Sequence, residues 1–222
     1  MRLWTIQTVE VYNKILETGI HYCDEELSMW LDIDCFVNAY NWMRTKMGDK
    51  IGKSEVKYPI WAWYAYNDKN RKPDLRRLGY AEKGTKHVCF QIEVDENKLL
   101  LSDFDLWHCV LNDCFVSDDD AKLDEFYTLS EDKQDKLKKE SWDKILVKKA
   151  EDIPKDVYIQ ATFFELRKED IKKCSFLLQS RIVKIICKSL YQMIKTLLAF
   201  YRKFLEKKRK ISYNITVKIK RK

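Results

Sequence analysis

Glycine and proline are scarce in this chain, which has five Gly and three Pro among 222 residues. Flexible linkers are rich in small or turn-forming residues, so this scarcity argues against several small domains joined by loose segments. Hydrophobic residues make up 45% of the chain and aromatic residues 13%, which is enough for a folded core. The length fits one domain, or one domain with an appendage.

Patterns for metal, disulfide and membrane sites are also missing. The seven Cys include no C-x-x-C pair, and the three His are scattered, so we expect no metal site. No apolar run approaches the roughly 18 residues that a membrane-spanning helix needs. The first residues do not resemble a secretory signal, so we expect a reduced, cytoplasmic protein without a transmembrane segment.

Charge is distributed unevenly along the chain. Residues 177–222 contain 14 Lys or Arg and a single acid, Glu206, which gives this segment a net charge of +13. The preceding residues carry 28 basic and 34 acidic side chains, a net charge of −6. The sequence therefore predicts a mildly acidic body over 1–176 and a basic tail over 177–222, with the tail as the part that attracts an anionic partner.

Periodicity predicts an α+β fold with a mixed, largely antiparallel sheet flanked by helices and a basic C-terminal helix-strand extension. A strand over 3–7 is followed by a helix that begins after Thr8 and ends at Gly19, then by a short strand over 20–23. A second helix is expected from Asp34 to Gly48. Further strands are expected at 58–66, 88–94 and 99–101, a helix after Ser102 or Asp103, a charged helix from Ser130 to about Lys149, and in the tail a helix over 182–205 and a strand over 211–219.

Glu165 is the candidate catalytic residue. It ends the stretch Tyr158–Glu165, in which Ile159, Ala161, Phe163 and Glu165 share one face if the whole stretch is a strand. Such a carboxylate either reaches water at the strand end or belongs to a site, and the pattern leaves both open. A carboxylate beside a sugar carbon can stabilise a developing oxocarbenium ion.

Three other features are candidates for binding. Trp61, Trp63 and Tyr64 could stack on a flat heterocycle, or fill a sheet face. Arg76 and Arg77 could bind phosphate, or stay solvated. The lone His108 could act as a base, or pack as a half-buried side chain. The basic tail could bind nucleic acid or a membrane surface, or dock on the body.

Five segments in a fixed order give the chain a resemblance to the bacterial family catalogued as domain of unknown function 3841, over residues 1 to about 176. That family name implies no activity. The segments are Leu3–Gln7, Tyr58–Tyr64, Lys72–Arg77, Leu101–His108 and Ile159–Leu166.

The order of elements also resembles the ADP-ribosyltransferase fold, which opens with a strand, a helix ending at Gly and a short strand. This resemblance implies that Thr5 or Gln7 contacts the ribose of NAD and that Glu165 stabilises the oxocarbenium ion. It also implies a nicotinamide pocket lined by Trp61, Trp63 or Tyr64.

The leading hypothesis is therefore an NAD-consuming ADP-ribosyltransferase that modifies nucleic acid or protein. The alternative is a non-catalytic module that binds nucleic acid or another protein. In that case the aromatic strand stacks on bases, and Arg76, Arg77 and the tail neutralise phosphates.

Overall fold

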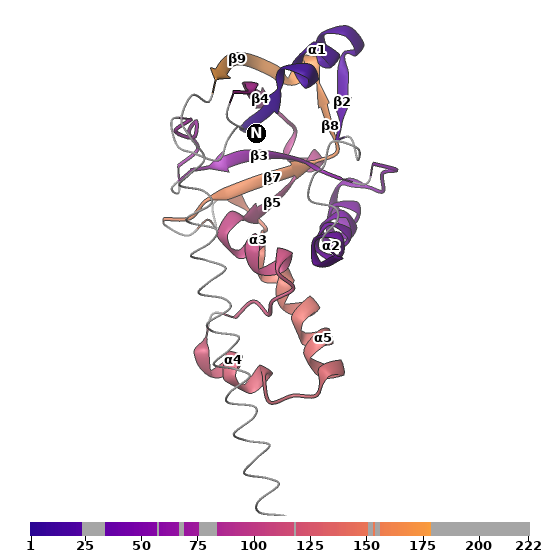
Figure 1. Ribbon diagram of the computed structural model, residues 1–222, viewed down its shortest axis with the longest axis vertical. Coiled ribbons are helices and arrows are strands. Elements are labelled where there is room, and N and C mark those ends of the chain that lie inside the picture. The colour runs from indigo at the N-terminus through magenta and orange to yellow at the C-terminus, as the bar shows by residue number, and fades with distance from the viewer. Residues whose placement is uncertain are drawn as a thin grey trace, which may run out of the picture. The chain divides into compact units, whose positions relative to one another are not determined.

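The computed structural model describes residues 1–23, 34–56, 58–66, 69–75, 84–117, 119–150, 153 and 156–178 (Figure 1). The chain divides into two compact units. One contains Met1–Asp74 and Lys86–Leu177, and the other contains Leu75–Thr85 and Leu178–Lys222. The helices and strands described below belong to the first unit, apart from the last residue of its final strand. The helix and the strand expected in the tail lie outside the described residues.

A seven-stranded sheet with the order β6-β5-β7-β3-β1-β4-β9 is the centre of the first unit. Strand β1 pairs antiparallel with β3 and β4, β7 pairs antiparallel with β3 and β5, and β5 pairs antiparallel with β6. The expected α+β class with a largely antiparallel sheet is thus confirmed. The strands are β1 (Arg2–Thr8), β3 (Ile60–Ala65), β4 (Lys86–Glu93), β5 (Leu100–Asp103), β6 (Leu146–Val147), β7 (Ile159–Phe163) and β9 (Ile171–Leu178).

The opening strand, helix and short strand form as expected. The hydroxyl of Thr8 accepts a hydrogen bond from the Val11 amide and so caps α1 (Val9–Thr18). The helix ends at Gly19, whose φ of 80° is left-handed and whose amide donates to the Ile15 carbonyl over 2.9 Å. β2 (Ile20–Tyr22) follows and pairs with β8 (Glu165–Arg167) in a separate two-stranded sheet.

The second helix is longer than the sequence predicted. α2 runs from Asp34 to Ile51, so Gly48 lies inside it and does not end it. The helix stops at Gly52, which has a φ of 104° and whose amide donates to the Gly48 carbonyl over 3.1 Å. The apolar spacing explains the extra turn: Met43 and Met47 are fully buried, and Ile51 continues the same stripe into the core.

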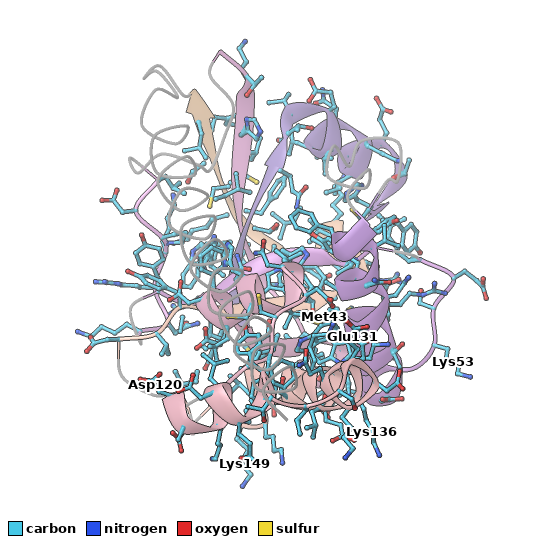
Figure 2. All side chains as sticks on the ribbon, turned by 60° about the horizontal axis from the view of Figure 1, so that its bottom comes forward. Met43, Lys53, Asp120, Glu131, Lys136 and Lys149 are labelled. Atoms are coloured by element: carbon cyan, nitrogen blue, oxygen red, sulfur yellow. The ribbon has the colours of Figure 1, made fainter. Side chains whose placement is uncertain are left out.

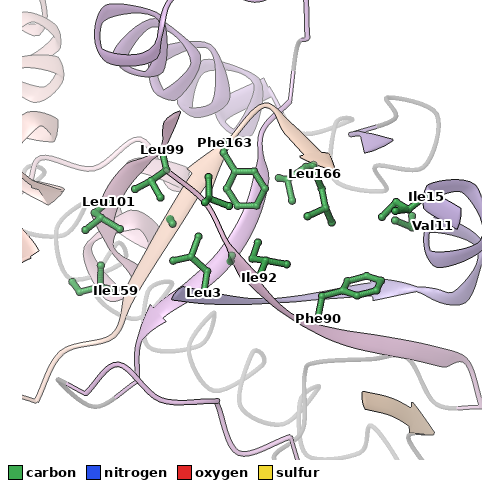
Figure 3. Packing of buried hydrophobic residues seen from close by; sticks show 14 of the residues in the cluster. Leu3, Val11, Ile15, Phe90, Ile92, Leu99, Leu101, Ile159, Phe163 and Leu166 are labelled. Atoms are coloured by element: carbon green, nitrogen blue, oxygen red, sulfur yellow. The ribbon is translucent and has the colours of Figure 1, made fainter. Parts of the chain in front are cut away.

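Two hydrophobic clusters cover the two faces of the sheet. Alternate strand residues such as Leu3, Ala161 and Phe163 pack with Val11 and Ile15 of α1 in the first cluster (Figure 3). The second cluster includes Leu100 and Trp61 and packs against α2 and α3 (Phe104–Leu111). The helices therefore lie on opposite faces, and strands β3 and β5 contribute side chains to both clusters.

The region between β5 and β7 differs from expectation. Asp103 caps α3 by accepting from the amides of Asp105 and Leu106, as predicted. The acidic segment after α3 forms a helix that was not predicted, α4 (Asp120–Phe126). The charged helix expected to reach Lys149 is shorter, because α5 (Glu131–Ser141) passes into a 3-10 helix, Trp142–Ile145, and then into β6. Trp142 and Ile145 are buried, and this anchoring ends the solvated helix.

Strand β9 was also not predicted, and a short 3-10 helix, Lys168–Asp170, precedes it. Within the described part of the chain, no helix is both long enough and apolar enough to cross a membrane.

Candidate functional site

Glu165 lies at a bend between the two sheets. The expectation of one strand from Tyr158 to Glu165 is wrong, because β7 ends at Phe163 and β8 begins at Glu165. Phe164, between them, turns its ring into the second cluster, whereas Phe163 packs in the first. Glu165 therefore does not continue the apolar face of β7. It lies opposite Tyr22 in the two-stranded sheet.

Two side chains orient the Glu165 carboxylate. Nε of Arg167 donates to Oε1 over 2.7 Å, and the Tyr22 hydroxyl donates to Oε2 over 3.5 Å. Arg167 follows Glu165 by two residues, so both side chains project from the same face of β8. The hydrogen bond and the negative charge of Glu165 raise the pKa of Arg167. The Glu165 side chain is 31% exposed, so its carboxylate is both held in place and open to a ligand.

A cavity of about 360 Å³ adjoins this carboxylate. One wall comes from the bend between β7 and β8, and the other comes from the loop after α2 and the 3-10 helix Glu96–Lys98. Its charged lining combines three cations with three carboxylates: Lys53, Lys98, Arg167, Asp95, Glu165 and Asp170. We call this the Glu165 pocket.

The carboxylates other than Glu165 already have backbone partners. Asp95 accepts from the Asn97 amide over 3.0 Å, and Asp170 accepts from the Arg167 amide over 3.2 Å. Burial raises the pKa of Asp170 above its usual value. The ammonium groups of Lys53 and Lys98 form no hydrogen bond or salt bridge with the described part of the chain, although the charge of Lys98 acts on the Asp170 carboxyl and offsets part of the effect of burial on its pKa. Both ammonium groups can therefore contact an anionic ligand. Figure 2 shows Lys53 projecting away from the body on its loop.

The tryptophans of β3 do not line the Glu165 pocket. The ring centroid of Trp61 lies 5.1 Å from that of Trp107 and 6.4 Å from that of Tyr40, between the sheet and the helices. The ring centroid of Trp63 lies 4.9 Å from that of Phe104, in another group of aromatic rings. Both indoles thus fill a sheet face, and the structure does not bring them together with Glu165 as an aromatic wall.

Tyr64 lies on the opposite face of β3, against the first cluster. It is half-buried, and burial raises its pKa. It is not among the residues that line the Glu165 pocket.

Thr5 and Gln7 form a short hydrogen-bonded chain. The Thr5 hydroxyl donates to the Trp61 carbonyl over 2.8 Å and accepts from Nε2 of Gln7 over 2.8 Å. Thr5 is 1% exposed, so its side chain joins β1 to β3 and does not reach a ligand. Gln7 is half-buried, and its amide keeps a carbonyl oxygen and a second N–H besides the N–H that it donates to Thr5.

The remaining candidates are His108 and the arginine pair. His108 is half-buried on α3, and its Nδ1–H donates to the Phe104 carbonyl over 2.8 Å. Arg76 and Arg77 lie outside the described residues, as do residues 179–222 of the tail. Among the residues that the structure does describe, no group of three or more His, Cys, Asp or Glu is placed to hold a metal ion.

Sequence reasoning missed most neighbours of Glu165. Arg167 has a signal, because a residue two positions along a strand shares the same face. Tyr22, Lys53 and Lys98 come from distant parts of the chain, and only the pairing of β2 with β8 and the packing of two loops bring them to Glu165.

The family comparison covers most of these elements. A family model described as "Domain of unknown function (DUF3841)" matches residues 2–172. The chain belongs to the DUF3841 family. No curated protein and no solved structure matches it. The DUF3841 match includes Glu165, Arg167 and both loops of the Glu165 pocket, so the pocket lies within the family domain.

Proposed function

We propose that this DUF3841 domain is an NAD-dependent ADP-ribosyltransferase-like enzyme in which Glu165 is the catalytic carboxylate. The observation that carries the proposal is an oriented carboxylate at a cavity that is also lined by the cations Lys53 and Lys98. NAD requires this combination, because its reacting ribose carbon becomes positively charged while its phosphates are negative. The residue types of the pocket therefore fit NAD as a substrate.

In the proposed reaction, the bond between ribose C1′ and the nicotinamide nitrogen breaks, and nicotinamide leaves with the bonding electron pair. Positive charge then develops on C1′ and the ring oxygen. A carboxylate about 4 Å away stabilises such a charge by about 4 kcal/mol at an effective dielectric constant of roughly 20. The acceptor's oxygen or nitrogen forms the new bond to C1′ and gives up its proton to water.

Arg167 and Tyr22 position Glu165 in this scheme. Two donors fix both carboxylate oxygens before the substrate arrives, so less reorganisation is needed as charge develops. The order of β1, α1 with Gly19, and β2 also agrees with the opening that the ADP-ribosyltransferase resemblance implies. The aromatic wall expected from Trp61 and Trp63 is not part of the proposed site.

Nicotinamide release from NAD tests the proposal. We expect the full chain to release nicotinamide and the Glu165→Gln variant to lose at least about 100-fold in kcat, which is typical when a positioned charge-stabilising group is removed. Glu169→Gln is the matched control, because Glu169 lies one turn away, 3.9 Å from Arg167, and is 69% exposed. Equal turnover by the wild type and Glu165→Gln would reject Glu165 as the catalytic group.

Nucleic-acid binding is the second candidate, and the net charge of +13 over residues 177–222 favours it. Neutralised phosphates release counterions, so the affinity for a single-stranded oligonucleotide should fall steeply with salt and should not change in Glu165→Gln. The same titration on a chain lacking residues 179–222 measures how much the tail contributes to the affinity for the oligonucleotide. An affinity that does not depend on salt contradicts this candidate.

A further inference from the structure

A second cavity of about 360 Å³ lies on α2 and its following loop. Asn41, Arg44, Thr45 and Gly48 have the spacing i, i+3, i+4 and i+7, so they occupy one face of the helix and form one wall. Gly48 has no side chain, which leaves that part of the wall open. The loop after Gly52 forms the other wall.

The two cavities adjoin at the turn after α2. Lys53 and Ser54 line both of them. A ligand at Glu165 that extends past Lys53 would therefore reach residues that also line the second cavity. Each cavity is near the lower end of the roughly 300–1,000 Å³ range of small-molecule sites, so each suits one nucleotide-sized group.

The charged lining of the second cavity combines two cations, Arg44 and Lys53, which suit a phosphate, with two carboxylates, Asp49 and Glu55. Arg44 donates one N–H to the Ser54 carbonyl over 3.4 Å, which fixes the guanidinium at the cavity and leaves other N–H groups for a phosphate. Lys53 supplies a second cation at the boundary. The amide of Asn41 offers the donor and acceptor pair that adenine recognises, and the Asp49 carboxylate can accept from ribose hydroxyls.

We infer that the second cavity binds the adenosine monophosphate half of the dinucleotide, with Lys53 between the two phosphates. This inference rests on the proposed function, since it assigns the part of NAD that Glu165 does not contact. It makes α2 and its loop the determinant of affinity, and the bend between β7 and β8 the place of reaction.

Calorimetric titration with AMP tests the inference on the full chain, separately from turnover. We expect AMP to bind and to compete with NAD, and Arg44→Gln to weaken AMP binding by about tenfold or more, because a charge-assisted contact to phosphate is lost. Gln retains a donor for the Ser54 carbonyl, so the fold should persist, as thermal unfolding will verify. Glu165→Gln should bind AMP as the wild type does.

The matched control is Lys136→Ala. Lys136 is an exposed lysine of α5 whose ammonium lies 4.0 Å from Glu140, and it is labelled with Lys53 in Figure 2. Lys136→Ala should leave AMP binding unchanged, whereas Lys53→Ala should weaken AMP binding. If NAD is cleaved but Arg44→Gln changes neither AMP affinity nor the KM for NAD, the inference is wrong and the proposed function survives. If AMP binds as expected but NAD is never cleaved, only the proposed function fails.

Discussion

Two glycines near the end of α2 provide a sharp test of where that helix stops. Gly48 lies within the helix, and a Cβ added there would meet only Cγ of Lys53 at 3.9 Å, an ordinary contact. Gly48→Ala should therefore stabilise the protein by about 0.5–1 kcal/mol, because Ala loses less conformational entropy in a helix interior. Gly52 has a φ of 104° and open space around its Cβ position, so Gly52→Ala should cost about 1–2 kcal/mol through backbone strain alone.

Urea denaturation of the full chain, followed by far-ultraviolet circular dichroism, measures both changes in the free energy of unfolding. Gly52→Asn is a useful third variant, since Asn tolerates the left-handed region better than Ala and should lose less. The opposite order, in which Gly48→Ala destabilises and Gly52→Ala does not, would mean that the helix ends at Gly48 and that the reasoning about α2 is wrong.

The other predictions concern burial. Phe163→Ala should lower the free energy of unfolding by about 3–5 kcal/mol, because the ring is 1% exposed in the first cluster. Phe176→Ala should lower it by less than about 1 kcal/mol, because that ring is 63% exposed. Chemical denaturation measures both losses, and equal losses would contradict the described packing. Burial, followed by the nearby Cys23, raises the pKa of Tyr40 to about 12. In the unfolded chain the pKa of a tyrosine is near 10, so between about pH 10 and 12 the unfolded protein loses this proton while the folded protein keeps it. The free energy of unfolding of the wild type should therefore fall by about 1.4 kcal/mol per pH unit over that range, relative to Tyr40→Phe. Parallel stability curves for the two proteins over that range would refute the burial of the hydroxyl.

Local signals made the start of the chain predictable. Thr8 as a cap and Gly19 as a left-handed stop act within one turn of their helix, so β1, α1 and β2 follow from sequence. The same signal misled at Gly48, because the burial of Met47 and Ile51 continues the helix past it. Tertiary packing overrides a local stop when another turn has an apolar face to bury.

The candidate site was predictable only in part. Glu165 stood out as a carboxylate after an apolar strand, but the bend at Phe164 follows from β8 pairing with β2, a contact between residues more than 140 positions apart. The pattern of Trp61 and Trp63 fits both stacking on a ligand and packing under a helix. Only the whole fold decides between the two. In this fold Trp107 and Phe104 of α3 pack against the two rings.

Calorimetric titration of the full chain with NAD is the most direct test of the central claim, that the Glu165 pocket is a site for this dinucleotide. We expect saturable NAD binding to the wild type and an affinity within about tenfold of it for Glu165→Gln, because that carboxylate acts mainly on the transition state. Absence of saturable binding to either protein would contradict it.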